Sequence, residues 1–522
     1  MPTVLHHKEP VVLVIIDGWG IGPENKGNAI SLAKTPTFDQ LDKDVGYLSL
    51  AASGAAVGLP DNQNGNSEAG HMNLGAGRIV KQDDVVILDA VESKQFYENQ
   101  SLKEALEHVQ RWDTNIHIMG LLTDTQSAHA DPRHVWALLE MCDAYALKKV
   151  WIHLFTDGRD SPPHHAITLL KQLREHMKPG QTIASVVGRF YAMDRKKEWK
   201  NTEKAYRLLA QGEGVHYTTA EEAIAHCYNK NMTDEFLEPS VIVDDQGQPV
   251  VKIEDNDSII FFNIRSDRAR QLTKVFVQDD FETANPGAFV RERVIRNVRF
   301  VGLTDFGPSL GTAMFAYHPQ PVPETLPMVL RDIRQFYLAE SEKFAHMTFF
   351  LNGGYAHPVG GEERQMIASP DLAHYEQKPE MMTKELIDCI ISEMEKCRYD
   401  FYAVNIAAPD MIAHTGDLQA TIKAVEATDT HIERLLEEVK KYNGHLVITA
   451  DHGNAECVLD PASGEVNTEH SSTPVPLYLI SSSHELDMTK KELVLGNVAP
   501  TICDLLGIKK PDAMTCESVL KK

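Results

Sequence analysis

The sequence predicts an α/β protein of two domains, each with a mainly parallel or mixed sheet flanked by helices. Short apolar runs rich in Val and Ile alternate along the chain with helix-like segments, which is typical of the α/β class. Runs of this length between Gly, Asp and Asn residues indicate buried strands of a parallel sheet. The chain has 522 residues, more than one hydrophobic core usually organises, so two domains are expected.

The predicted strands form two groups that end in different kinds of residue. Strands of the first group come from both ends of the chain, and acidic residues follow three of them. Strands of the second group come from the middle of the chain, and arginines follow several of them. The first group comprises residues 11–16, 347–351, 402–407 and 446–450, and the second comprises residues 116–122, 151–155, 182–187 and 259–264.

This order along the chain predicts a discontinuous outer domain with a second domain inserted into it. The Pro-rich segment 317–323 marks one junction, and the segment 75–84 marks the other. We expect residues 1–80 and 318–522 to form the outer, metal-binding domain and residues 81–317 to form the inserted, substrate-binding domain. Two linkers would allow a hinge motion between the domains.

Acidic residues after three strands of the first group are candidate metal ligands. Asp17, Asp410 and Asp451 follow these strands, and His452 comes directly after Asp451. In open parallel sheets, ligands bind beyond the carboxyl ends of the strands, so these side chains can converge. Carboxylates and imidazoles suit Mn, Mg, Co or Zn. The sequence therefore predicts a metal site at this edge of the sheet.

Two further histidines extend this set of candidate ligands. Asp410 and His414 are four residues apart, so a helix would place both on one face as ligands of one ion. His470 lies in a predicted loop, residues 468–474. A surface ion pair would also explain Asp410 and His414, and a single histidine is more often structural than a ligand. Together the motifs favour a metal site, because each lies next to a strand of the same predicted sheet.

Ser67 lies in the Gly- and Asn-rich segment 64–71. A serine in such a turn before a predicted helix exposes its hydroxyl beside backbone N–H groups, which favours phosphoryl transfer to it. A serine alone is a weak nucleophile, but a divalent cation would lower the pKa of its hydroxyl. An N-cap serine is the alternative interpretation, and it is the commoner one for an isolated Gly-Asn-Ser segment.

Basic residues follow strands of the second group. Asp157-Gly-Arg159-Asp160 follows one strand, Arg189 follows the next, and Arg265 and Arg268 follow another. The chain has 51 Lys and Arg residues against 75 Asp and Glu residues, a net charge of −24. Such an acidic chain opposes non-specific nucleic-acid binding, so an anionic substrate requires a local basic cluster. Surface salt bridges would explain any single arginine, but several at strand ends favour an anion pocket.

Other features of the sequence exclude several classes of protein. No apolar stretch approaches the roughly 18 residues that a membrane span requires. The seven cysteines form no C-x-x-C pair and leave one over, which indicates reduced thiols; with no export segment in residues 1–10, we expect a cytoplasmic protein. The motif Gly18-x-Gly20-x-Gly22 is not a dinucleotide fingerprint, because its third glycine comes one residue early and position 23 is proline. We expect no nucleic-acid, membrane or nucleotide partner.

Seven motifs, taken in order, resemble those of the cofactor-independent (2,3-bisphosphoglycerate-independent) phosphoglycerate mutases, a family of the alkaline phosphatase superfamily. The resemblance extends from about Val11 to Pro476 and implies an alkaline-phosphatase-like outer domain with an inserted α/β domain. The motifs are Val14-Ile-Ile-Asp17-Gly-Trp-Gly, Gly65-Asn-Ser67-Glu-Ala-Gly-His, Asp157-Gly-Arg-Asp160, Gly188-Arg-Phe-Tyr-Ala-Met-Asp-Arg195, Phe262-Asn-Ile-Arg265-Ser-Asp-Arg268, Pro409-Asp-Met-Ile-Ala-His-Thr-Gly and Thr449-Ala-Asp-His-Gly-Asn.

The resemblance implies a role for each candidate residue. Ser67 would be the nucleophile, Asp160 the general base and acid, and Lys343 would neutralise charge on the phosphoryl oxygens. The implied ligands are Asp17, Ser67, Asp451 and His452 for one metal ion, and Asp410, His414 and His470 for the other. The implied substrate residues are His129, Arg159, Asp160, Arg189, Arg195, Arg265, Arg268 and Lys343. The loop that ends at His129 is one residue longer than is usual in the family.

The implied activity is that of an isomerase, a phosphoglycerate mutase that interconverts 3-phosphoglycerate and 2-phosphoglycerate in glycolysis and gluconeogenesis. A phosphoserine at Ser67 would hold the phosphoryl group while glycerate reorients. Two divalent ions, expected to be Mn(2+) with Mg, Co or Zn as alternatives, would stabilise the attacking and leaving oxygens. Domain closure would exclude water. The enzyme would need no bisphosphoglycerate and no nucleotide, and it would be a cytoplasmic monomer.

Two other kinds of function share features with a phosphoglycerate mutase. A phosphohydrolase or phosphopentomutase of the same superfamily would share the metal site, but the arginine-bearing middle domain argues against both. A catalytically silent phosphate-binding protein would be expected to lack the nucleophile or a metal ligand. This chain has Ser67 and every implied ligand.

Overall fold

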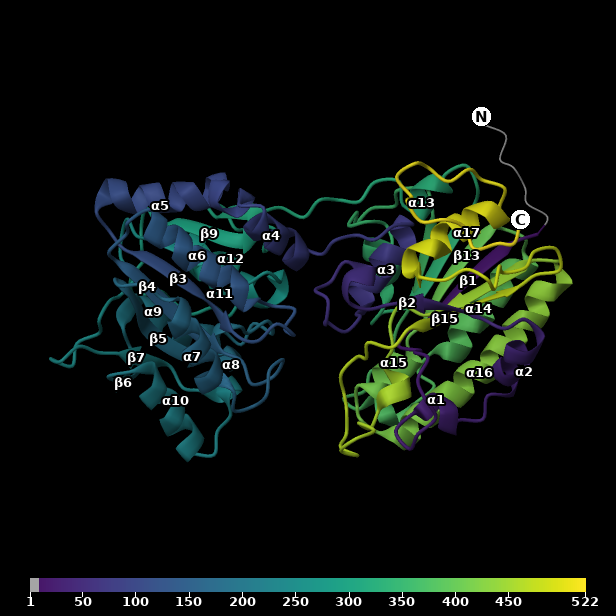
Figure 1. Cartoon of the computed structure of the whole chain (residues 1–522), viewed down its shortest axis with the longest axis horizontal. Coiled ribbons are helices and arrows are strands. Elements are labelled where there is room, and N and C mark those ends of the chain that lie inside the picture. The colour runs from purple at the N-terminus through teal and green to yellow at the C-terminus, as the bar shows by residue number, and fades with distance from the viewer. Residues whose placement is uncertain (1–8) are drawn as a thin grey trace. The chain divides into compact units, whose positions relative to one another are not determined.

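The computed structural model describes residues 9–522, and within them the chain folds as two compact units (Figure 1). The first unit extends to Gln82 and resumes at Gln320, and the second is Asp83–Pro319. The predicted domain boundaries, after residues 80 and 317, lie two residues from these divisions. Each unit contains one eight-stranded sheet flanked by helices, which confirms the predicted α/β class.

The sheet of the first unit is built around strand β1 (Val11–Ile16), whose six residues are all buried. Strands β13 (Phe401–Ile406) and β14 (His445–Thr449) pair with β1 on its two sides, both in parallel. Three predicted strands that are far apart in the sequence are therefore direct neighbours. Their carboxyl ends lie at the same edge of the sheet, as the prediction of a metal site requires.

The remaining strands complete a mixed sheet in the order β12-β11-β13-β1-β14-β15-β2-β16. Strand β15 is antiparallel to both of its neighbours, and the other pairs are parallel. These strands are β2 (Leu48–Ala51), β11 (Gln335–Glu340), β12 (Glu363–Ile367), β15 (Val475–Ile480) and β16 (Leu493–Val494).

Two groups of helices flank this sheet (Figure 1). The long helix α16 packs with α1, α2, α14 and α15, and helix α3 packs with α13 and α17. The bounds are α1 (Ala29–Leu32), α2 (Pro36–Asp44), α3 (Ser67–Ala76), α13 (Leu326–Val329), α14 (Thr383–Glu395), α15 (Ala408–Ala413), α16 (Leu418–Lys441) and α17 (Val498–Leu505).

The predicted strand at residues 347–351 is wrong. His346–Phe350 forms a short π-helical turn that packs against α3, and the strand of this region is β11, which ends before it. Leu351 lies so close to α3 that a Cβ on Gly75 would overlap its carbonyl oxygen. A five-residue apolar run has the same composition in a buried turn as in a buried strand, so periodicity could not separate the two.

The second unit has the strand order β10-β9-β8-β3-β4-β5-β7-β6. Its strands are parallel except for the pair of β5 and β7. The predicted strand 259–264 ends at Phe261, because the chain there leads into helix α11. The strands are β3 (Ile116–Leu122), β4 (Val150–Thr156), β5 (Gln181–Gly188), β6 (Val215–Tyr217), β7 (Ser240–Ile242), β8 (Ser258–Phe261), β9 (Arg299–Thr304) and β10 (Met314–Tyr317).

Nine helices of the second unit are described, and several begin at side-chain caps. The side chain of Asn99 accepts a hydrogen bond at the start of α5, and Asp131 does so at the start of α6. The helices are α4 (Asp83–Glu92), α5 (Gln100–Trp112), α6 (Pro132–Ala144), α7 (Ala166–His176), α8 (Arg189–Ala192), α9 (Trp199–Gln211), α10 (Ala220–Asn229), α11 (Ser266–Val277) and α12 (Phe281–Ala284). Among residues 9–522, no helix is long and apolar enough to cross a membrane.

Candidate functional site

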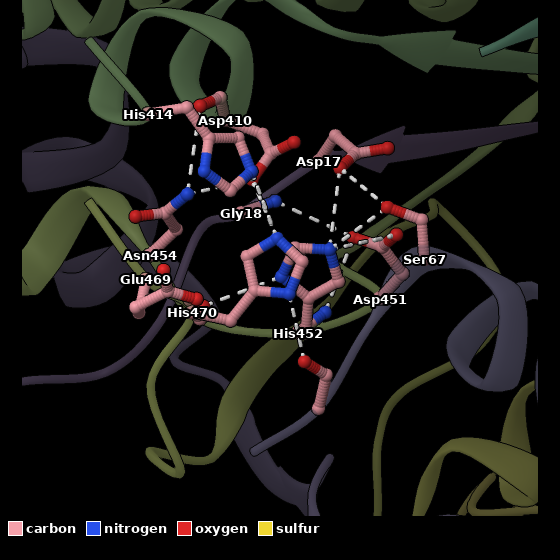
Figure 2. A network of polar contacts seen from close by, with 12 residues as sticks. Asp17, Gly18, Ser67, Asp410, His414, Asp451, His452, Asn454, Glu469 and His470 are labelled. Carbon is pink, nitrogen blue, oxygen red and sulfur yellow. Dashed lines mark hydrogen bonds and ion pairs between the residues drawn. The ribbon is translucent and has the colours of Figure 1, made fainter. Parts of the chain in front are cut away.

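Three buried carboxylates converge at the carboxyl edge of the first sheet (Figure 2). Asp17 directly follows β1, Asp451 comes two residues after β14, and Asp410 lies in the first turn of α15, which begins after β13. Each is at most 1% exposed. Burial alone would raise the pKa of Asp410, but the ammonium group of Lys343 lowers it well below its ordinary value. The site therefore holds Asp17 and Asp410 in the charged form.

Ser67 is the first residue of helix α3, and its hydroxyl faces this cluster. The N-cap is Asn66, whose side chain accepts from the backbone N–H of Ala69, so the N-cap interpretation of Ser67 is wrong. The Ser67 Oγ atom lies 3.3 Å from Asp17 Oδ1 and 3.0 Å from His452 Nε2. The positive end of a ten-residue helix favours negative charge at this oxygen.

A second set of side chains lies beside the first. The Nε2 atoms of His414 and His470 lie 3.4 and 3.5 Å from Asp410 Oδ1, and 2.9 Å from each other. Because the Nδ1 atoms contact carbonyl oxygens, each Nδ1–H donates: that of His414 to Thr468 and that of His470 to Gly65. Both rings then direct their Nε2 atoms to one point, as metal-binding histidines do.

His452 connects the two sets. Its ring stacks on that of His470 with centroids 3.9 Å apart, and its Nε2 atom lies 3.4 Å from Asp17 Oδ1. Burial would lower the pKa of His452, but Asp451 and the neighbouring carboxylates raise it to about 9. Without a metal ion, these carboxylates thus attract a proton to a buried imidazole, which shows how strongly the site favours a cation.

The donor atoms fit divalent cations. Two groups have ligand atoms within 4.8 Å of one another: Asp17, Asp451 and His452, and Asp410, His452 and His470. His452 belongs to both groups, so the geometry places it nearer to the second set than the sequence indicated. Among residues 9–522, no group donates a well-directed hydrogen bond to Asp451 Oδ2, although His71 Nδ1 lies 3.2 Å away. Carboxylate oxygens and imidazole nitrogens suit Mn, Co, Zn or Mg.

Lys343 lies within this cluster and not with the arginines. Its ammonium group donates to Asp17 Oδ1 at 2.6 Å, to Asp410 Oδ2 at 2.7 Å and to Ser67 Oγ at 2.8 Å. Burial would lower the pKa of Lys343, but Asp17 and Asp410 raise it above its ordinary value, so the group stays charged. One cation therefore contacts the proposed nucleophile and one carboxylate of each ligand set.

Two buried residues that the sequence did not single out support the carboxylates. The amide nitrogen of Asn405 donates to Asp17 Oδ2 at 2.8 Å and to His71 Nε2 at 3.1 Å. His71 Nδ1 in turn lies 2.9 Å from the carbonyl oxygen of Ser67 and 3.2 Å from Asp451 Oδ2. A polar Asn inside the apolar run of β13 was the available signal for this contact.

The arginine cluster of the second unit forms around the ends of β4 and β5. Arg189 Nη1 donates to Asp157 Oδ1 at 2.5 Å and to Asp160 Oδ2 at 2.8 Å. The Ser127 hydroxyl donates to Asp160 Oδ2 at 2.7 Å. Burial would raise the pKa of Asp160, but Arg189 lowers it, so this carboxyl is ionised. An ionised, partly exposed carboxylate can accept a proton.

The other predicted substrate residues surround this pair. Burial lowers the pKa of Arg268, and so do the nearby cations of Arg189, Arg195 and Arg159. Together they bring it to about 10. Such mutual repulsion is relieved when an anion binds between the cations. Arg159 and Arg195 are about half exposed and contact Glu235 and Asp267, respectively, while Arg265 is the N-cap residue of α11.

His129 is buried within the same cluster. Burial lowers its pKa to about 3, assisted by the charge of Arg189, so its imidazole is neutral. Its Nδ1 atom has no hydrogen-bond partner among the described residues. A neutral imidazole with a free ring nitrogen can bind a hydroxyl or phosphate oxygen. The second unit therefore brings together His129, Asp160 and five predicted arginines.

Comparisons with known proteins agree with this arrangement. The model of the Metalloenzyme superfamily matches residues 9–510. A curated relative from Clostridioides difficile, named 2,3-bisphosphoglycerate-independent phosphoglycerate mutase, is 42% identical over 99% of this chain and 100% of its own length. A relative of the same name from Moorella thermoacetica is 42% identical over 98% of each chain. The crystal structure of Leishmania mexicana phosphoglycerate mutase at low cobalt concentration matches with a TM-score of 0.78, 29% identity and 98% coverage of both chains.

Proposed function

The chain belongs to the 2,3-bisphosphoglycerate-independent phosphoglycerate mutases of the Metalloenzyme superfamily, and from that premise we propose how its residues divide the reaction. The protein is a metal-dependent isomerase that interconverts 3-phosphoglycerate and 2-phosphoglycerate in glycolysis. Its substrate is a small molecule with a phosphate and a carboxylate. The first unit transfers the phosphoryl group, and the second unit binds glycerate.

Ser67 is the nucleophile in this proposal. The observation that carries it is the position of Ser67 Oγ, 2.8 Å from Lys343 Nζ and 3.0 Å from His452 Nε2 at the N-terminus of α3. In the first half-reaction, Ser67 Oγ loses its proton and bonds to phosphorus, the bond from phosphorus to the C3 oxygen of 3-phosphoglycerate breaks, and that oxygen gains a proton. In the second half-reaction, the C2 hydroxyl loses its proton and attacks the phosphoserine, and Ser67 Oγ is released and regains a proton.

Two divalent ions are assigned to the convergent ligands. Asp17, Ser67, Asp451 and His452 would hold one ion, and Asp410, His414 and His470 would hold the other. When bound, these ions would lower the pKa of the Ser67 hydroxyl and neutralise the phosphoryl oxygens. We propose Mn(2+) for both ions, with Co, Zn or Mg as alternatives, because the donors are carboxylate oxygens and imidazole nitrogens.

The chain's own residues do the remaining work. Lys343 offsets negative charge that develops on the phosphoryl oxygens and on Ser67. Asp160, which is ionised beside Arg189, relays a proton in both half-reactions: it passes the proton lost by Ser67 to the leaving oxygen, and it later takes the proton of the attacking glycerate hydroxyl. Arg265 and Arg268 bind the carboxylate and phosphate of the substrate as planar donors, and neutral His129 binds an oxygen of the same molecule.

The arginine cluster also favours a mutase over a phosphohydrolase. A hydrolase must only bind a phosphate and admit water, whereas a mutase must retain glycerate after its phosphoryl group has left. Five arginines and Asp160 in the second unit supply that retention. We further propose a cytoplasmic monomer without a nucleic-acid or membrane partner, supported by the net charge of −24 and by seven free cysteines.

The test is the formation of phosphoserine at Ser67. Wild-type protein mixed with 3-phosphoglycerate and quenched in acid is expected to carry a phosphoryl group on Ser67, detected by mass spectrometry of its peptides. Ser67→Ala removes the acceptor and only one hydroxyl, so it should keep the fold and lose mutase activity in the absence of bisphosphoglycerate. Normal turnover by Ser67→Ala would contradict the proposed mechanism.

A further inference from the structure

Gly20 and Gly22, the last two glycines of the motif Gly18-x-Gly20-x-Gly22, lie against a buried carboxylate, that of Glu456. A Cβ on Gly22 would lie 2.8 Å from Cγ of Glu456, and a Cβ on Gly20 would overlap the carboxyl group of the same residue. Gly453 approaches from a different loop, where a Cβ would lie 2.6 Å from Glu456 Oε1. Three glycines from two segments thus leave room for one side chain that is 2% exposed.

Four hydrogen bonds converge on the carboxylate of Glu456. The backbone N–H groups of Gly20 and Asn454 donate to Oε2 at 3.0 and 2.9 Å. The hydroxyls of Ser471 and Thr473 donate to Oε1, that of Thr473 at 2.8 Å. Each oxygen therefore accepts two hydrogen bonds, and all four donors are uncharged. A carboxylate is the one side-chain group that can accept from all four, because it has two acceptor oxygens and no donor.

The four donors lie in three segments that each carry a proposed metal ligand. Gly20 comes three residues after Asp17, and Asn454 comes two residues after His452. Ser471 directly follows His470. Gly20 and Glu456 are 436 residues apart in the sequence. Glu456 joins them at one point, whereas Asp410 and His414 are positioned by helix α15.

We propose that Glu456 is a positioning residue that holds the three ligand-bearing segments in register for metal binding, and that the Gly-x-Gly motif exists to admit it. The inference rests on the proposed ligand assignment. Removal of a residue that orients metal ligands without binding the metal typically weakens metal binding about 10- to 100-fold. Since the three segments carry ligands of both ions, loss of Glu456 weakens both.

The substitution Glu456→Gln tests this inference. Gln has nearly the same size, but its NH2 group would face two donors in place of two acceptor lone pairs. The control is Glu362→Gln, because Glu362 is also buried and accepts from the backbone N–H groups of Val359 and Gly360, from Asn352 and from the guanidinium of Arg364. None of its donors lies in a segment that carries a proposed ligand.

The measurement is the affinity of each purified protein for Mn(2+), obtained by competition with a chromophoric chelator, together with the unfolding temperature of the metal-free protein. We expect Glu456→Gln to bind both ions about 10- to 100-fold more weakly, and Glu362→Gln to bind them as wild type does. We expect both variants to unfold at a lower temperature than wild type. A carboxylate with a purely structural role would change the unfolding temperature alone. Wild-type affinities in folded Glu456→Gln would overturn the inference.

A milder variant covers the case in which Glu456→Gln does not fold. Thr473→Val removes one of the four donors and keeps the side-chain shape, so we expect a few-fold weaker binding with an unchanged fold. Unchanged binding in Thr473→Val would then overturn the inference. Failure of the ligand assignment gives a different result: wild-type protein would bind fewer than two ions, or His470→Ala would bind both as tightly as wild type.

Discussion

The ammonium nitrogen of Lys343 lies 2.8 Å from the hydroxyl oxygen of Ser67 and donates to it. The same nitrogen contacts Asp17 and Asp410, one carboxylate from each proposed ligand set. Lys343 comes from a turn after β11, a strand that does not pair with β1. A buried cation thus lies where the proposed nucleophile and both proposed ligand sets meet. Its charge can stabilise a phosphoryl group on Ser67 although Lys343 belongs to neither ligand set.

Replacing Lys343 should separate catalysis from metal binding. Lys343→Met keeps the length of the side chain and removes its charge, so we expect kcat to fall about 100- to 1,000-fold, as when one donor to a developing oxyanion is lost. Metal affinity should stay the same or increase, because a cation that competes for Asp17 and Asp410 is gone. Steady-state kinetics and a Mn(2+) titration check both results. Loss of metal together with activity would show that Lys343 mainly supports the fold of the site.

Single ligand substitutions should remove the ions separately. His414→Ala leaves Asp17, Asp451 and His452 in place, so it should weaken one ion and retain the other. Asp451→Asn should have the converse effect, while a chelator should remove both ions and all activity. Elemental analysis after dialysis measures the number of ions per chain. Equal loss of both ions in His414→Ala and Asp451→Asn would show that the two sites do not bind independently.

The sequence predicted the parts of this site that depend on strand ends. Continuous runs of Val and Ile indicate buried parallel strands, and an acidic residue directly after such a run must lie at the carboxyl edge of the sheet. This is why Asp17, Asp410 and Asp451 could be identified before the fold was known. The order of the strands in the sheet could not be predicted in the same way, because the composition of a strand does not show which strands pair with it.

The supporting residues could not be predicted for a different reason. Asn405 and Asp17 are 388 residues apart, and Glu456 and Gly20 are 436 apart, yet each pair is joined by one hydrogen bond. A single buried polar residue has no periodicity, so the sequence does not show which donor it meets. The sequence shows Gly20 and Gly22, but the reason that they are glycines is the side chain of Glu456, which lies more than four hundred residues away.

Damage to the arginine cluster should convert part of the mutase activity into hydrolysis. Arg268→Ala removes a cation of the second unit that is proposed to bind glycerate, so mutase turnover should fall roughly 100-fold while metal content is unchanged. Glycerate that escapes from the phosphoenzyme allows water to replace it, and the ratio of free phosphate to 2-phosphoglycerate should rise. The exposed Arg174, which pairs with Glu221, provides the control Arg174→Ala. An unchanged ratio in Arg268→Ala would place the substrate elsewhere.

A buried hydrogen-bonded chain in the second sheet should control its stability toward acid. Because Asp257 can only accept, His117 Nε2 donates to it at 3.1 Å, and His117 Nδ1 then accepts from His153 Nε2 at 2.9 Å. The hydroxyl of Ser185 lies 2.8 Å from His153 Nδ1 and completes the chain. Burial lowers the pKa of His153 well below its ordinary value, and His117 lowers it further.

The sign of the resulting pH dependence follows from proton uptake. Below about pH 6.5, His153 is protonated in the unfolded chain but not in the folded chain. As the pH decreases, the free energy of unfolding therefore decreases by up to about 1.4 kcal/mol per pH unit because of this group. His153→Gln should be less stable than wild type at pH 7, because it disturbs the chain of hydrogen bonds. That difference should shrink by about 2 kcal/mol between pH 6.5 and 5, since the variant takes up one proton fewer on unfolding. Guanidinium unfolding followed by tryptophan fluorescence measures this, because four of the 5 tryptophans belong to the second unit. A stability difference that stays constant over this range would mean that folded protein protonates His153 as readily as the unfolded chain does.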